Sequence, residues 1–279
     1  MKPLTIEDII LSDSSRGMEN LRALLPPDFC RRAAAALLGL KKGNVLIATG
    51  FYVKGHAETD GPPGAYFLAR ALNACGFHAV VVTDSLCEGL FREIPVEVLP
   101  FEVCESQCVA LIEAYDPKAL ISVERCGVNA RGEYANMHGE SIAAHTAKLD
   151  PLFAEGRRRN IPTIGIGDGG NEIGMGNFRD VIERELSLCP CVTEVNYPVI
   201  ATVSNWGGYS LCACLENLTG RAVMPEGSEV QAYLEEITAH GCVDGVTGQH
   251  TPTVDGFPQG MEAVIAATLK AKQVSAMVL

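Results

Sequence analysis

Short, continuous apolar runs recur along the chain, and they constrain its fold more than any other feature. Such runs that end near Gly or a polar residue are typical of parallel strands covered on both faces. They occupy residues 44–50, 78–84, 96–100, 119–124 and 161–167. Helix-like segments alternate with them at residues 64–75, 85–93, 104–115 and 141–159. The alternation predicts a three-layer α/β fold, with a mostly parallel sheet and helices on both of its faces.

The two ends of the chain fit the same architecture. Residues 1–40 favour helix, residues 192–200 favour a strand, and the later segments 206–217, 228–240 and 261–272 favour helices. The sequence holds no internal repeat and no Ser/Gly-rich linker, so we expect one α/β domain over residues 1–279. In such a sheet, ligand sites lie at the carboxyl ends of the strands.

Charge and cysteine usage narrow the class of protein. The formal net charge of -12 argues against nucleic acid or an anionic membrane as a partner. The eleven cysteines are an odd number, and the Cys189/Cys191 and Cys212/Cys214 pairs lack the two-residue gap of a zinc knuckle. We therefore expect buried, reduced thiols. The first residues do not resemble a signal peptide, and no apolar run is long enough to span a bilayer. These features predict a cytoplasmic protein, and they allow a homo-oligomer.

Carboxylates follow the first predicted strand. Glu58 and Asp60 come just after it, before a helix that Pro62 can begin, and Thr49 lies at the strand end. Asp60 has two interpretations. It caps the helix that follows, or it belongs to a functional site. His56 lies close enough to the two acids to carry a proton.

A charged pair, Glu124 and Arg125, follows the fourth predicted strand. A surface ion pair is one interpretation of it, and such a pair contributes only about 0–1 kcal/mol. Arg at a strand end is also the residue that binds a substrate carboxylate through two parallel hydrogen bonds. The irregular loop 126–140 follows, and its Tyr134 and Asn136 could add hydrogen bonds to a ligand.

The fifth predicted strand leads into a glycine-rich loop, residues 165–176, which contains six glycines. Much glycine indicates positive φ angles or a close approach of backbone to a ligand. A phosphate or a divalent cation would fit, and a capped turn is the alternative without a ligand. Two carboxylates, Asp168 and Glu172, and the lack of a Lys favour oxygen-ligated Mg²⁺ or Mn²⁺. The Gly-x-Gly-x-x-Gly spacing within this loop is weak support for dinucleotide binding.

A fourth polar cluster, residues 203–209, contains Asn205 and the only tryptophan, Trp206. Asn205 stands at a predicted helix start, where it either caps that helix or reaches into the site. Trp206 is expected to be partly in the core. The histidines show no metal-ligand spacing and no nucleophile elbow accompanies them, which argues against histidine-centred hydrolysis.

Together these segments resemble the D-glutamate cyclase family, in the domain that forms the C-terminal part of longer mitochondrial members. The resemblance covers residues 58–65, 124–136, 152–153, 165–176, 205–209 and 254–256. It implies an enzyme that closes D-glutamate to 5-oxo-D-proline with loss of water, with a divalent metal bound by acidic residues. Cys126 departs from the pattern, where a small residue such as Ala is expected.

The resemblance and the residue chemistry together give a set of predicted roles. A small amino acid is the expected substrate and Mg²⁺ or Mn²⁺ the expected cofactor. The predicted catalytic residues are Glu58, Arg125 and Asn171. The predicted substrate-binding residues are Thr49, Tyr134, Asn136, Asn205 and Trp206. The predicted metal ligands are Asp60, Glu124, Asp168 and Glu172. Two other functions fit the same acidic site: a metal-dependent phosphatase or other hydrolase, and a non-catalytic amino-acid binding protein.

Overall fold

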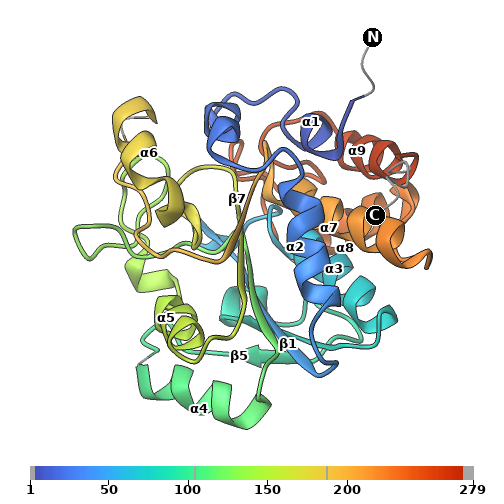
Figure 1. The fold of residues 1–279 in the computed structure, drawn as a ribbon. Coiled ribbons are helices and arrows are strands. Elements are labelled where there is room, and N and C mark those ends of the chain that lie inside the picture. Colours follow the sequence, from blue (N-terminus) through green and yellow to red (C-terminus); the bar gives the residue numbers. More distant parts are fainter. Residues whose placement is uncertain (1–3, 104, 187, 273–279) are drawn as a thin grey trace.

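A six-stranded parallel sheet organises the protein (Figure 1). The computed structural model describes residues 4–103, 105–186 and 188–272. The strand order is β5-β4-β1-β6-β7-β8, and every neighbouring pair is parallel. The strands are β1 (Asn44–Thr49), β4 (His78–Thr83), β5 (Val96–Val98), β6 (Ala119–Val123), β7 (Thr163–Gly167) and β8 (Tyr197–Ile200). The sequence-based prediction of a parallel α/β sheet is confirmed.

Helices cover both faces of the sheet, as the side chains of β1 show. Val45 and Ile47 enter one hydrophobic core, and Leu46 and Ala48 enter another on the opposite face. Successive residues of a strand point to opposite faces, so a strand apolar at every position needs cover on both. The first core contains residues of α2 (Phe29–Leu38), α3 (Pro62–Ala74), α7 (Ser204–Thr219), α8 (Gly227–Ala239) and α9 (Met261–Lys270), and the second contains residues of α4 (Glu105–Tyr115) and α5 (Asp150–Arg158).

Helices α3 and α7 approach each other closely near their N-terminal ends. A Cβ atom added to Gly208 would lie 2.7 Å from the Cα atom of Gly64, so neither position has room for a side chain. Because these glycines let the backbones touch, the first turns of the two helices lie side by side. Asp60 precedes one of these helix starts and Asn205 lies in the other.

Several predicted helices are shorter than the sequence suggested. The helix predicted over residues 1–40 is instead divided into α1 (Ile6–Ile10), the 3₁₀ helix η1 (Met18–Leu24) and α2, because the polar segment 12–17 follows α1 and the two prolines of segment 25–28 follow η1. Residues 85–93 keep only the 3₁₀ turn η2 (Ser85–Cys87), and 141–159 form η3 (Ala143–His145) and α5. The strand predicted at 192–200 is confined to β8. Cys104, the predicted start of α4, lies outside the described residues.

The remaining elements are a two-stranded hairpin, β2 (Tyr52–Val53) with β3 (His56–Ala57), the 3₁₀ helix η4 (Met175–Phe178) and α6 (Arg179–Leu186). The ten cysteines of the described residues are free thiols, and all but Cys189 are buried. No helix in the described part of the chain is both long and apolar enough to cross a membrane.

The strand order creates a switch point between β1 and β6. After β1 the chain adds β4 and β5 on one side, and it then returns to add β6, β7 and β8 on the other. Loops that leave β1 and β6 therefore diverge at the carboxyl end of the sheet, where open α/β folds bind their ligands. Acidic residues fill this crevice.

Candidate functional site

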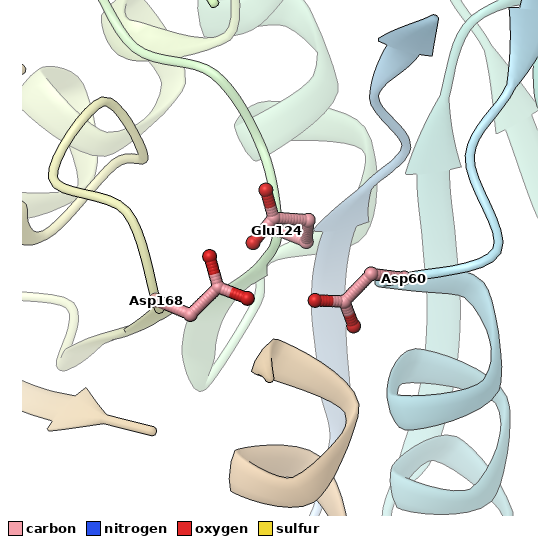
Figure 2. Close-up of side chains that lie close together, drawn as sticks. All are labelled: Asp60, Glu124 and Asp168. Carbon is pink, nitrogen blue, oxygen red and sulfur yellow. The ribbon is translucent and has the colours of Figure 1, made fainter. Parts of the chain in front are cut away.

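Three carboxylates from three different loops converge at the switch point (Figure 2). Asp60 follows β1, Glu124 follows β6 and Asp168 follows β7. One oxygen from each lies within 4.8 Å of the others, and the residues are only 1%, 5% and 1% exposed, respectively. We call this set the acidic cluster. Hydrogen-bonded strands fix its spacing, because β1 pairs with β6 and β6 pairs with β7.

Ser204, the first residue of α7, contacts all three members of the acidic cluster. Its backbone N–H lies 2.8 Å from Asp60 Oδ2 and 3.1 Å from Asp168 Oδ2, and its hydroxyl donates to Glu124 Oε2 at 2.6 Å. The N-terminus of a helix carries a partial positive charge and unpaired N–H groups, which stabilise anions. The start of helix α7 thus bonds to every member of the acidic cluster.

Asp60 and Asn205 cap each other's helix. Asp60 Oδ1 accepts from the N–H of Asn205 in α7 at 2.7 Å, and Asn205 Oδ1 accepts from Gly61 and Gly64 of the α3 start at 2.9 Å each. The interpretation of Asp60 as the cap of its own helix is wrong, since that N-cap residue is Gly61. Asn205 likewise caps the neighbouring helix rather than its own. Each side chain caps a helix that is distant from it in the sequence, and no sequence pattern predicts such a pairing.

Burial raises the pKa values of the acidic cluster. Desolvation is the largest cause for Asp60 and for Glu124, and the negative charge of Asp168 is the next. The pKa of Asp168 is raised less, because Arg16 opposes the desolvation. Buried carboxylates this close together cannot all ionise without a compensating positive charge. The raised pKa values therefore make the acidic cluster easier to protonate than exposed carboxylates.

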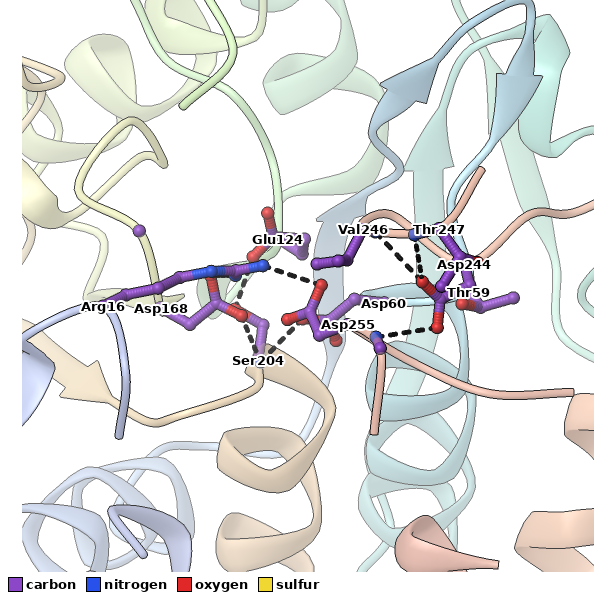
Figure 3. A network of polar contacts seen from close by, with 12 residues as sticks. Arg16, Thr59, Asp60, Glu124, Asp168, Ser204, Asp244, Val246, Thr247 and Asp255 are labelled. Atoms are coloured by element: carbon purple, nitrogen blue, oxygen red, sulfur yellow. Dashed lines mark hydrogen bonds and ion pairs between the residues drawn. The ribbon is translucent and has the colours of Figure 1, made fainter. Parts of the chain in front are cut away.

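Arg16 supplies the positive side chain of the site (Figure 3). Its Nη1 lies 2.7 Å from Asp168 Oδ1, and its Nη2 lies 2.9 Å from Asp255 Oδ1. It comes from the irregular segment between α1 and η1, and its side chain is 24% exposed. Among the described basic residues, it is the one that pairs with these carboxylates. Asp168 raises the pKa of Arg16 most, so this guanidinium stays charged.

Asp255 is buried with few partners. Its contact with Arg16 is an ion pair without hydrogen-bond alignment, and neither carboxylate oxygen receives a hydrogen bond from another described residue. Desolvation, followed by the charge of Asp168, raises its pKa to about 7. Its backbone has a φ of 53°, and Glu124 has a φ of 48°. Non-glycine residues adopt this left-handed region at a cost, and such strain is concentrated at functional sites.

Glu58 completes the group of acids, from the same loop as Asp60. Its carboxylate lies over Gly245, where an added Cβ would be 1.6 Å from Oε1, so glycine is required there. Desolvation, and then the charge of Asp255, raises the pKa of Glu58 well above its ordinary value. Glu58 can therefore carry a proton beside the acidic cluster.

Arg125, which the sequence predicted to bind a substrate carboxylate, has several partners within the protein. It is fully buried, and its Nη2 contacts Asp84 at 2.6 Å and the carbonyl of Ala147 at 2.7 Å. Its Nη1 donates to the carbonyl of Gly50 at 2.8 Å. The alternative of a surface ion pair with Glu124 is wrong, because both residues are buried and Arg125 pairs with Asp84.

Glu172 lies in the glycine-rich loop, and its carboxylate binds backbone N–H groups of that same loop. Its carboxylate accepts from the N–H groups of Asp168, Gly169 and Gly170, at 3.2, 2.7 and 2.7 Å. Gly170 has a φ of 103°, which lets the chain turn around the carboxylate. Glu172 is therefore apart from the three clustered acids, and it shapes the loop that presents Asp168.

The other predicted site residues have contacts of their own. Tyr134 donates to Asp150 at 2.7 Å, and Asn136 bonds within the turn 136–140. Trp206 is fully buried, donates to Glu262 and lies beside Phe257. The Asn171 Oδ1 and Thr49 Oγ1 atoms are buried without a described hydrogen-bond partner. His56 is exposed and contacts His250. None of these contacts tests a role in substrate binding or catalysis.

Comparison with known proteins identifies the family. The model of the D-glutamate cyclase-like, C-terminal family matches residues 6–270. The chain belongs to this family. Human mitochondrial D-glutamate cyclase is 32% identical over 292 residues, and the match covers 87% of this chain and 47% of that protein. This member thus spans about half the length of its curated relative.

The solved structures add little to the family assignment. An E. coli tRNA N6-threonylcarbamoyladenosine dehydratase in complex with AMP is 12% identical, and the match covers 77% of this chain and 99% of that one. Its TM-score of 0.31 is too low to bear on fold or function.

Sequence reasoning missed several residues of the site in this family member. Arg16 and Asp84 belong to no predicted functional pattern. Ser204 lies in the same polar cluster as Asn205, but no role was predicted for it. Asp255 lay within the last segment of the resemblance, but no role was predicted for it. A loop acid followed by glycine, as in Asp255-Gly256, was the one available signal.

Proposed function

We propose that this chain is a D-glutamate cyclase, which converts D-glutamate to 5-oxo-D-proline and water. Its family membership and its similarity to the human enzyme support this reaction. The acidic cluster is the single structural observation that carries the proposal. Three buried carboxylates meet at the switch point, where α/β folds bind small ligands.

The donor set of the acidic cluster fits a divalent cation such as Mg²⁺ or Mn²⁺. Hard cations take carboxylate oxygens as ligands, and the cluster offers one from each of three residues within 4.8 Å of one another. Each oxygen has two lone pairs, so the bonds from Ser204 and Arg16 leave capacity for a metal. When bound, the metal would neutralise the substrate γ-carboxylate and the negative charge that develops on it.

The protein must also move protons during ring closure. The substrate ammonium loses one proton before its nitrogen bonds to the γ-carbon and a second one afterwards, and one γ-oxygen takes up two protons and leaves as water. Glu58 is the acceptor that we propose for the ammonium proton, because its raised pKa makes it a stronger base than an exposed carboxylate. The buried site excludes bulk water, which strengthens the electrostatic interactions that act on the reacting groups.

A product assay tests the proposed reaction. The purified protein is incubated with Mn²⁺ or Mg²⁺ and either D-glutamate or L-glutamate, and 5-oxoproline is measured by mass spectrometry after chiral separation. We expect product from the D enantiomer, with a loss of 18 mass units that corresponds to one water. Parallel samples with a chelator show whether metal is required. If neither enantiomer gives 5-oxoproline under any metal condition, the proposed reaction is wrong.

A further inference from the structure

An α-amino acid presents two opposite charges on one carbon, and the cyclase site must hold both. The α-carboxylate needs a cation, yet the acidic cluster repels it. The α-ammonium needs an acceptor that is not already occupied. We therefore asked which described residues at the switch point could offer one charge of each sign.

Arg125 does not meet the first need. Both of its terminal nitrogens are bonded, to the carbonyls of Gly50 and Ala147 and to Asp84. The guanidinium is fully buried, and a substrate carboxylate would have to displace these partners. Leaving Asp84 as a buried, unpaired carboxylate would cost more than a substrate contact returns.

Arg16 meets that need. Its side chain is 24% exposed, compared with 1% and 3% for the side chains of its partners Asp168 and Asp255. It lies on a segment without regular structure, between Ile10 and Met18, so its movement breaks no helix or strand. Its two terminal nitrogens bridge two separate carboxylates, and the same planar fork fits the two oxygens of one carboxylate.

Asp255 meets the second need. Its carboxylate is buried, its Oδ1 faces Arg16 Nη2 at 2.9 Å in an ion pair, and neither oxygen receives an aligned hydrogen bond from the described residues, so the carboxylate can accept from a ligand once Arg16 turns away. Its strained backbone, with a φ of 53°, aims that carboxylate toward Arg16 beside Asp60 (Figure 3). A buried acceptor without donors is costly unless a ligand supplies them. An ammonium group supplies three.

We propose that the Arg16–Asp255 ion pair is the element that recognises the α-amino-acid group of the substrate. The pair opens when D-glutamate binds, so that Arg16 holds the α-carboxylate and Asp255 accepts from the α-ammonium. This exchange leaves the local charge unchanged, because one internal ion pair is replaced by two contacts to a zwitterion. The inference rests on the proposed cyclase function, and it identifies the part of the substrate that each residue reads.

Three ligands separate the two contacts. D-glutamate has both α groups, glutarate lacks the ammonium, and 4-aminobutanoate lacks the α-carboxylate. Dissociation constants in the presence of Mn²⁺ are obtained from ligand-dependent shifts in melting temperature, which require no turnover. We expect the wild-type protein to bind D-glutamate at least about tenfold more tightly than either analogue, since each lost contact is a charged hydrogen bond.

Variants should give a crossed pattern. Arg16→Gln should weaken D-glutamate and glutarate by about tenfold or more and leave 4-aminobutanoate within about twofold. Asp255→Asn should weaken D-glutamate and 4-aminobutanoate and leave glutarate unchanged. Arg16→Lys, which keeps the charge but loses the fork, should fall between the wild type and Arg16→Gln. The matched control is Arg22→Gln, which removes a different ion pair of the N-terminal region, to Asp8 at 3.0 Å.

Each outcome decides a separate question. A variant that weakens all three ligands equally, or none, overturns the recognition element. If a variant does not fold, the wild-type protein still provides a test. Binding of glutarate or 4-aminobutanoate as tightly as D-glutamate would overturn the recognition element. A crossed pattern without any 5-oxoproline supports the recognition element and rejects the proposed reaction. Product formation without the crossed pattern supports the proposed reaction and rejects the recognition element.

Discussion

Two arginines, Arg125 and Arg16, lie near the carboxyl end of the sheet. They differ in how many hydrogen-bond partners they and their carboxylates have within the protein. Arg125 is fully buried, and its two terminal nitrogens bond to Asp84 and to backbone carbonyls from two other segments, while its Nε has no hydrogen-bond partner among the described residues. Arg16 is partly exposed and bridges Asp168 and Asp255, of which Asp255 has no hydrogen-bond donor among the described residues. The sequence drew attention to the first, but the second has the features of a functional cation.

The comparison shows that a charged residue at a strand end can be structural even inside a functional crevice. Arg125 joins the ends of β1 and β4 to the segment before α5, so it stabilises the scaffold on which Glu124 and Asp60 stand. Arg16 balances charge that would otherwise destabilise the fold, and its partners remain available for exchange. The terminal nitrogens of Arg125 are both bonded within the protein, which fits a structural role, whereas the buried Asp255 carboxylate still has room for a hydrogen-bond donor.

The largest expected effect is on stability, at Arg125. Arg125→Met leaves Asp84 buried without its cation, and we expect the free energy of unfolding to fall by about 3–5 kcal/mol. Urea denaturation of the purified variant measures this. Arg16→Lys is the matched comparison and should cost less than about 1 kcal/mol, because that side chain is partly exposed and keeps its charge. If Arg125→Met unfolds like the wild type and changes only the KM, Arg125 is instead a substrate clamp.

The next effect is on metal affinity, at Asp168. Asp168→Asn removes one of the three clustered carboxylates, and we expect Mn²⁺ binding to weaken by at least about 100-fold. Mutation of residues that only hydrogen-bond to metal ligands weakens binding by about 10–100-fold, so loss of a ligand itself should cost at least as much. Calorimetric titration measures the affinity. Asp116→Asn serves as the control, because Asp116 is exposed and pairs with Lys118 on the surface. Equal affinity in the wild type and Asp168→Asn would remove Asp168 from the metal site.

The third effect is on the pH dependence of stability, at Asp255, and it is the smallest when it is counted per pH unit. Its pKa is about 7 in the folded protein and 3.8 ordinarily, so between these values the folded chain holds a proton that the unfolded chain has lost. The metal-free protein should therefore lose stability as pH rises from about 4 to about 7, by at most about 1.4 kcal/mol per pH unit from this group. Asp255→Asn should reduce that slope in urea denaturation series. An unchanged slope would show that Asp255 does not hold a proton.

The strands of the sheet could be predicted from the sequence because burial on both faces leaves a direct mark on composition. Val45 to Ala48 are apolar at every position, and the structure covers both faces of this strand. The predicted helix at 85–93 failed for a related reason. Its apolar residues Leu90 and Phe91 are buried outside any helix, and Cys87 lies in a single 3₁₀ turn, so burial alone misled the prediction.

The candidate site was only partly predictable. Asp60, Glu124 and Asp168 each follow an apolar strand, and parallel strands bring their carboxyl ends together, so their convergence could be expected. Arg16 and Asp255 come from irregular segments at opposite ends of the chain, and no periodic pattern relates such segments. The mutual capping of Asp60 and Asn205 likewise depends on how α3 packs against α7.

The contact between Gly64 and Gly208 has a consequence for how rigid the candidate site is. Where these two backbones touch, no side chain lies between them that could repack, so the first turns of α3 and α7 are held at a fixed spacing. Asp60 and Asn205 stand at these two helix starts. We therefore expect this edge of the site to be preorganised, with the same spacing before and after a ligand binds.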